Sequence, residues 1–398
     1  MTRPHIALDF RWLDQLSICN GQYRYATDLI RGLAAQHLPA QFVVLGSQPV
    51  PVAEIASVFR DHKRWRYHCI PRLTGRGAAY REQLRYQFLL RRLKIDVLHA
   101  LHSFVPLFSP VTVVATVYDL MAELFPEYNG IAHSREYRLH RRAFQRNVAR
   151  AVAISQTTAD DLRRLWNFPA ERTDVVYLGP DLPTVAVGER RADPPIILAP
   201  YNLEPRKNLC KLLDAVAKLR YMGRRFQLVL FGRAALNEER ECEFHARLDE
   251  LELRSSTTLT GSISDEKLAE LYRSASVFVF PSLYEGFGLP VLEAMSAGAC
   301  VIAHNESAMP EILGDAGLLI DMRSVQAICA GLVHALRSPG LGTRAAQRAC
   351  MFSRERMASE TYAVYEKALA EATEVRRLPA GWADHALPDR IAQDLGAD

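Results

Sequence analysis

The chain of 398 residues lacks an apolar run long enough to span a bilayer, and its first residues have no signal-peptide pattern. Its seven cysteines are scattered without the paired spacing of a zinc site or a disulfide framework. They are typical of small apolar side chains in a reducing compartment. We therefore expect a cytoplasmic protein without a transmembrane helix and without a metal centre.

Motifs of nucleic-acid binding are also missing, since no zinc knuckle, RNP-like segment or basic zipper is present. Of the residues, 49% are hydrophobic and 24% are charged, a composition typical of globular proteins. The length suits two domains of ordinary size, each able to bury its own core.

The net charge of +4 hides an asymmetry between the two halves of the chain. Residues 1–182 hold 24 Lys and Arg against 16 Asp and Glu, out of totals of 49 and 45. The excess concentrates between Arg60 and Lys94. Such a surface attracts phosphorylated acceptors, lipid head groups or nucleic acid, and it equally suits a solvated helix face. We expect no nucleic acid and a peripheral contact with the inner face of an anionic membrane.

Short β-branched runs alternate with helical patterns along the chain, which predicts parallel sheets of the doubly wound α/β class. The first domain is expected at 1–182 and the second at 183–359, joined by a proline-rich linker within 179–195. Helices from about 360 to 398 are expected to return to the first domain. Two further helices are expected at 78–93, with Leu84 and Phe88 inward, and at 137–150.

The stretch from Pro281 to Gly298 predicts a ligand site. A buried strand precedes it, two glycines follow in the loop, and Pro290 stands where a helix begins. Backbone N–H groups at a helix N-terminus suit a phosphate-bearing ligand. Glu285 and Glu293 are then placed to accept hydrogen bonds from sugar hydroxyls, although the glutamates and glycines are equally compatible with a plain turn and helix start.

Glu285-Gly286-Phe287-Gly288-Leu289-Pro290, with Glu293 eight residues after Glu285, resembles the glutamate-x7-glutamate signature of retaining glycosyltransferase family 4. The resemblance runs from about Ile6 to Ala368. It implies the GT-B architecture, in which two facing Rossmann-like domains bind a nucleotide diphosphate sugar between them. It also implies that Glu285 contacts the sugar, that Glu293 contacts the ribose, and that residues 286–289 bind the donor.

Four other segments resemble the same family. Glu204-Pro205-Arg206-Lys207-Asn208 matches the element whose two cations hold the donor diphosphate, and Ile263 falls in the segment that lines the nucleobase. Gly21 lies in the loop that approaches the donor phosphates, but Tyr23 replaces a second glycine there. Tyr118 replaces the histidine of a His-Asp pair that faces the sugar, and a phenol is not a base near neutral pH.

The resemblance implies a retaining hexosyltransferase that needs no cofactor, with Glu285, Arg206, Lys207 and Tyr118 as its catalytic set. Because no Asp-x-Asp occurs, the two cations are expected to act in place of a metal. Residues 305–311 resemble mannosyl-type members of surface-polysaccharide pathways, with GDP-mannose as a candidate donor and a glycan or lipid-linked acceptor. The alternatives are a catalytically weakened nucleotide-sugar binder, favoured by Tyr23 and Tyr118, and a phosphorylase-like or epimerase enzyme, which would lack this signature set.

Overall fold

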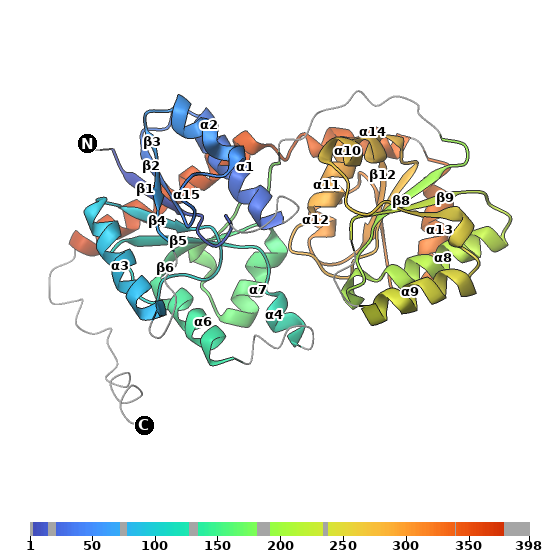
Figure 1. Cartoon of the computed structure of the whole chain (residues 1–398), viewed down its shortest axis with the longest axis horizontal. Helices are drawn as coiled ribbons and strands as arrows, with labels where there is room; N and C mark the ends of the chain where they lie inside the picture. The colour runs from blue at the N-terminus through green and yellow to red at the C-terminus, as the bar shows by residue number, and fades with distance from the viewer. Residues whose placement is uncertain are drawn as a thin grey trace.

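The computed structural model describes residues 3–14, 21–71, 78–126, 134–180, 192–233, 238–338 and 340–377. Most of the expected linker and the tail after Arg377 lie outside these residues. Two lobes stand side by side, and each is built on one sheet (Figure 1).

The first lobe contains a parallel sheet of seven strands in the order β3-β2-β1-β4-β5-β6-β7. Its central strands are nearly continuous runs of buried apolar residues, as expected for a sheet covered on both faces. The strands are β1 (His5–Asp9), β2 (Gln41–Gly46), β3 (Trp65–Cys69), β4 (Val97–Ala100), β5 (Thr112–Val117), β6 (Val148–Ala153) and β7 (Thr173–Val175).

The second lobe contains a parallel sheet of six strands in the order β10-β9-β8-β11-β12-β13. The strands are β8 (Ile196–Pro200), β9 (Gln227–Phe231), β10 (Thr257–Leu259), β11 (Val277–Phe280), β12 (Cys300–His304) and β13 (Leu318–Ile320). Two parallel sheets of this kind confirm the expected two-domain, Rossmann-like architecture.

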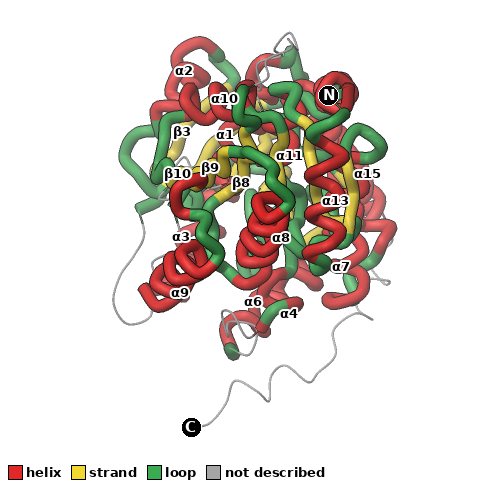
Figure 2. Tube along the Cα trace, turned by 90° about the vertical axis from the view of Figure 1, so that its right-hand side faces the viewer, coloured by secondary structure: helices red, strands yellow, loops and turns green. Residues whose placement is uncertain are grey.

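Helices cover both faces of each sheet. On the first sheet, one face carries α1 (Gly21–Ala35), α2 (Ala53–Asp61) and α15 (Arg354–Arg377), and the other carries α3 (Ala78–Arg92), α6 (Arg135–Asn147) and α7 (Gln156–Trp166). On the second sheet, α10 (Asp265–Ser274), α11 (Leu289–Ser296) and α12 (Met309–Leu313) cover one face. Helices α8 (Leu209–Tyr221), α9 (Glu238–Glu250) and α13 (Val325–Ala335) cover the other (Figure 2). The remaining helices are α4 (Met121–Leu124) and α14 (Gly340–Ala349).

The C-terminal helix α15 joins the two lobes. It begins after Ser353, whose hydroxyl accepts from the N–H of Arg356 at 3.1 Å, and it packs along α1 of the first lobe. The return therefore starts at Arg354, slightly before the expected residue 360. Phe352, just ahead of the helix, packs against Phe287 of the second lobe, with ring centroids 6.0 Å apart. One hydrophobic core consequently runs through both lobes on this side.

Two expectations about helices of the first lobe were wrong. Leu84 and Phe88 of α3 are 51% and 66% exposed, because Tyr86 and Leu90 occupy the side facing the sheet. The Tyr86 hydroxyl donates to the buried carboxylate of Asp9 at 2.8 Å, which fixes that orientation. Helix α6 ends at Asn147 and not at Arg150, because the chain enters β6 at Val148.

Candidate functional site

The carboxyl ends of the strands in both sheets point toward the junction between the lobes, where open α/β sheets bind ligands. The segments after β8 and β11 come from the second lobe, and those after β1 and β5 come from the first. Most of the predicted site residues lie on these four segments.

Arg206 and Lys207 lie in a single turn of 3-10 helix, Pro205–Lys207, after β8. Asn208 ends the turn in the left-handed conformation, with φ of 56°. Its side-chain amide donates to the carbonyl of Met322 at 2.7 Å, which holds the turn in place. The two cations are thus presented together from a fixed loop.

Glu285 receives both cations. Its Oε1 accepts from Nζ of Lys207 at 2.5 Å and from the guanidinium of Arg206 at 3.1 Å, and its side chain is 15% exposed. Burial on its own would raise the pKa of Glu285, but Lys207 and Arg206 offset this and hold it below the usual range. The side chain of Glu285 is therefore ionised, and its negative charge lies between the positive charges of Arg206 and Lys207.

The two loop glycines have different steric roles. A Cβ at Gly286 would lie 2.0 Å from the carbonyl oxygen of Tyr118, so this glycine lets the two lobes touch. Gly288 has φ of +99° and precedes α11, whose Pro290 has no N–H that would need an acceptor in the first turn. Phe287 is buried among core rings, so its side chain is closed to a ligand, and the predicted donor contact of its backbone stays a prediction.

Glu293 is also engaged across the junction. One of its oxygens accepts from Arg24 of α1, and the other accepts from the Tyr272 hydroxyl at 2.9 Å. Burial raises the pKa of Glu293, and Arg24 and Tyr272 counteract this only in part. The predicted ribose contact stays a prediction, and in it the sugar would either share Glu293 with Arg24 or displace Arg24.

Tyr118 does not direct its hydroxyl at the two cations. The hydroxyl donates to the carbonyl of Leu101 at 2.7 Å inside the first lobe, and burial raises the pKa of this phenol well above 10. The next residue, Asp119, faces Glu285, Arg206 and Lys207 electrostatically, and burial raises its pKa. The catalytic role predicted for Tyr118 is untested, and Asp119 is the better placed of the two.

Tyr23 points into the first lobe. It belongs to α1, and its hydroxyl donates to Glu54 of α2 at 2.6 Å, so the ring lies inside the first lobe. Gly21 faces Leu289, whose Cδ1 would lie 3.5 Å from an added Cβ. Ile263 is half-buried between β10 and α10, and its predicted role at the nucleobase stays a prediction.

Two contacts across the junction had no signal in the sequence. The Glu311 carboxylate accepts from the N–H groups of Gln156 and Thr157, at the start of α7. The Tyr284 hydroxyl donates to Asp161 of the same helix at 2.5 Å. An anion at a helix N-terminus is favourable, and both contacts hold the second lobe against the first.

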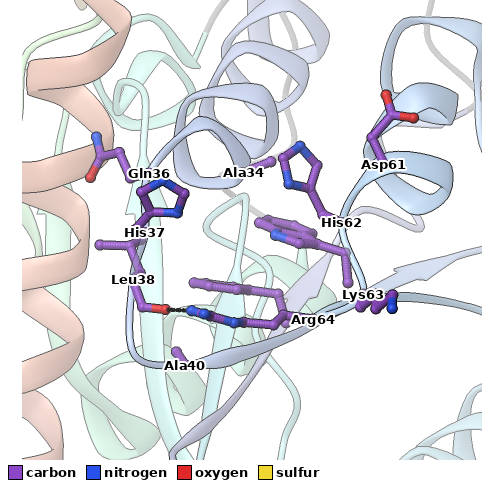
Figure 3. Close-up of a pocket in the computed structure, with 11 residues that line it drawn as sticks. Ala34, Gln36, His37, Leu38, Ala40, Asp61, His62, Lys63 and Arg64 are labelled. Carbon is purple, nitrogen blue, oxygen red and sulfur yellow. Dashed lines mark hydrogen bonds between the residues drawn. The ribbon is translucent and has the colours of Figure 1, made fainter.

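The cavities do not mark the site. A cavity of about 200 Å³ lies at the opposite, amino-terminal edge of the first sheet, lined by His37, His62 and Arg64 among others (Figure 3). A space of about 10 Å³ at the junction is lined in part by Arg24 and Leu289. In the described part of the chain, no group of three or more His, Cys, Asp or Glu could hold a metal ion. None of the described helices is long and apolar enough to cross a membrane.

Residues 185–350 match the family described as glycosyl transferases group 1, and residues 19–183 match Glycosyltransferase Family 4. The chain is 30% identical over 302 residues to O-antigen chain mannosyltransferase B of Escherichia coli, spanning 71% of this chain and 77% of that protein. It is 35% identical over 238 residues to MMP alpha-(1->4)-mannosyltransferase of Mycolicibacterium hassiacum, spanning 57% of each.

Solved structures share the fold. Sucrose-phosphate synthase from Thermosynechococcus elongatus superposes with a TM-score of 0.73 at 22% identity, covering 93% of this chain and all of that one. Anabaena HepE in complex with UDP and glucose gives a TM-score of 0.68 at 16% identity, covering 92% of this chain and all of HepE.

Proposed function

The chain belongs to the group 1 glycosyltransferases of family 4, and on this premise we propose that it transfers a hexose, with retention of configuration, from a nucleotide diphosphate sugar. The donor we propose is GDP-mannose, because the relatives described above include mannosyltransferases. The proposed acceptor is a glycan or a lipid-linked saccharide, reached at the inner face of a membrane.

The observation that carries this proposal is the convergence of Arg206, Lys207 and Glu285 beside Asp119. A donor diphosphate is an anion that can take over both cations from the Glu285 carboxylate. Glu285, released in this way, becomes free to accept hydrogen bonds from the hydroxyls of the attached sugar. The same exchange places the sugar against the first lobe, from which the acceptor approaches.

The proposed reaction breaks the bond between the anomeric carbon and the phosphate oxygen. The electron pair passes to the diphosphate, and Arg206 and Lys207 stabilise its charge without a metal. The acceptor oxygen bonds to the anomeric carbon on the face that the leaving group vacates. Its proton passes to the leaving phosphate oxygen, so no side-chain nucleophile is required.

The test is a transfer assay with GDP-mannose, preceded by thermal unfolding with UDP, GDP and ADP, since a bound nucleotide raises the apparent stability. Glu285→Gln is expected to lower transfer by about a hundredfold or more, as loss of a positioned group does elsewhere. Nucleotide binding should survive in that variant. Glu250→Gln is the matched control, because Glu250 is an exposed glutamate that pairs with Arg247 within α9.

Stabilisation by a nucleotide without donor turnover would instead support the alternative of a weakened nucleotide-sugar binder. The inward orientation of Tyr23 and Tyr118 removes the steric reason for that alternative, because neither ring fills the ligand side of the junction. Stabilisation by none of the three nucleotides would refute both assignments.

A further inference from the structure

The outward side of α3 combines arginines with large apolar side chains. Its exposed residues recur at helical spacing, and none is acidic: they are Arg81, Leu84, Arg85, Phe88, Arg91 and Arg92. Leu84 and Phe88 lie one turn apart, so the two side chains form a ridge. Large apolar groups in such a ridge on a water-soluble surface usually mark an interaction site.

The outward side of α6 repeats this pattern. Its exposed residues are Arg135, Glu136, Arg138, Leu139, Arg142 and Arg146. Helices α3 and α6 pack on the same face of the first sheet (Figure 1). Glu136 is the exposed acid among the described side chains of the two helices.

The loop after β4 joins the two helices into one surface. The Gln83 side chain of α3 accepts from the N–H of Leu107 at 2.9 Å, and Asn147 of α6 donates to the Leu107 carbonyl at 2.7 Å. Held in this way, the loop exposes Phe104 and Phe108 to 43% and 55%. We call the exposed residues of α3, α6 and this loop the basic-apolar face.

The basic-apolar face continues to the edge of the sheet where substrates bind. Phe104 follows β4, and its ring centroid lies 6.5 Å from that of Trp12, which follows β1 and is 52% exposed. The carboxyl ends of β1 and β4 are neighbours in the sheet. A surface held against this face would therefore present its molecules beside the junction between the lobes.

We propose that the basic-apolar face docks this protein on an anionic phospholipid bilayer, with Leu84, Phe88, Phe108 and Leu139 inserted among the lipid head groups. Arginines around apolar side chains match the interfacial pattern of helices that lie in a membrane surface. Each arginine gains from the negative potential of anionic lipids. The proposal rests on the proposed function in one respect, that a lipid-linked acceptor would be reached there.

The exposed aliphatic side chains favour a lipid bilayer over nucleic acid as the anionic partner. Nucleic acid offers bases that stack on aromatic rings, but it offers no partner for Leu84 or Leu139 on the ridges of helices. A bilayer offers both a charged surface and an apolar layer beneath it. The combination of arginines and aliphatic side chains on each helix therefore indicates a lipid bilayer as the partner of the basic-apolar face.

Co-sedimentation with vesicles tests the proposal without donor or acceptor. The wild type is expected to bind vesicles that contain both phosphatidylcholine and phosphatidylglycerol, and not to bind vesicles of phosphatidylcholine alone. It should dissociate from the anionic vesicles as the salt concentration rises. Leu84→Ser with Phe88→Ser should lower the partition coefficient roughly tenfold or more. Arg85→Gln with Arg92→Gln should lower it by roughly fivefold for each arginine.

The second lobe supplies matched controls, since Tyr221, Met222, Arg224 and Arg225 are exposed at the end of α8. The corresponding pairs of Ser and Gln substitutions there should leave vesicle binding unchanged. Equal binding to neutral vesicles, or equal loss in the control variants, would overturn the proposal. So would capture of a single-stranded oligonucleotide in place of vesicles.

Thermal unfolding with GDP is measured on the same variants without vesicles. Normal nucleotide stabilisation with no vesicle binding by the wild type would refute the docking face and leave the proposed function standing. Vesicle binding without stabilisation by any nucleotide would refute the proposed function and leave the docking face standing.

Discussion

Arg24 of the first lobe forms an ion pair with Glu293 of the second, and the Glu293 side chain is 7% exposed where the lobes meet. The same carboxylate accepts from Tyr272 of its own lobe. Glu285 is occupied in a comparable way by Arg206 and Lys207. Both carboxylates of the family signature therefore already accept hydrogen bonds from protein side chains, with which the hydroxyls of a donor sugar would compete.

Arg24→Gln is expected to tighten the binding of nucleotide diphosphate, because Arg24 no longer competes with ribose hydroxyls for Glu293. One hydrogen bond to a charged group is worth about 1.5–3 kcal/mol, so the gain should be about tenfold or more. Glu293→Gln should weaken the same binding. Isothermal titration with GDP, using the exposed Arg31→Gln as the control, measures both effects.

Weaker nucleotide binding in Arg24→Gln would contradict this interpretation. It would mean that Arg24 contacts the nucleotide itself after releasing Glu293.

Lys207→Ala is expected to cut turnover by roughly two powers of ten, because its charge matters most as the diphosphate leaves. Donor affinity should change less. A chelator should leave the wild type active, since the cations act where a metal would otherwise stand. Lys211→Ala, an exposed lysine on the following helix, is the control. Full activity of Lys207→Ala, or loss of wild-type activity with chelator, would refute the cation mechanism.

The strands and the loops at their ends could be predicted from the sequence, because buried β-branched runs and glycines act locally. Arg206, Lys207 and Glu285 were expected in one catalytic set only through the family resemblance. In the structure they meet because they follow β8 and β11, which are adjacent strands of the second sheet. Their direct ion pairs in the absence of a donor were not expected. A sequence motif indicates which residues bind the ligand. It does not indicate which side chains those residues pair with inside the protein.

The sequence could not orient α3, because that helix carries two apolar stripes. Tyr86 and Leu90 face the sheet, while Leu84 and Phe88 face outward. The choice depends on Asp9, which is distant in sequence and accepts from Tyr86. The ion pair between Arg24 and Glu293 could not be predicted from the sequence either. The two residues are far apart in the chain, and either side chain could instead be solvated by water, so no sequence pattern indicates that they meet.

Tyr118→Phe is expected to retain most of the activity, because the hydroxyl that it loses points to Leu101 and not to the cations. The cost should be stability, at about 1 kcal/mol for a buried carbonyl deprived of its donor. The pH–rate profile should keep its basic limb, since the pKa of Tyr118 lies well above 10. A collapse of turnover in Tyr118→Phe, against normal turnover in the neighbouring Tyr25→Phe, would restore a catalytic role.

His99 should make the first lobe sensitive to acid. The imidazole is fully buried between the Tyr365 hydroxyl of α15, at 2.7 Å, and the Thr116 hydroxyl, at 2.8 Å. Burial, together with the smaller effect of the charge of His102, lowers the pKa of His99 from 6.5 to about 3. The folded protein thus holds His99 neutral at pH values where the unfolded chain takes up a proton.

The sign of the effect follows from this difference in proton uptake. Above pH 6.5, His99 is neutral in both states and its contribution to the free energy of unfolding is fully present. Between pH 6.5 and about 3, protonation of the unfolded chain removes that contribution by up to about 1.4 kcal/mol per pH unit. Urea unfolding midpoints across this range should fall more steeply for the wild type than for His99→Gln. The exposed His334→Gln should keep the wild-type slope, and equal slopes in all three proteins would refute the assignment to His99.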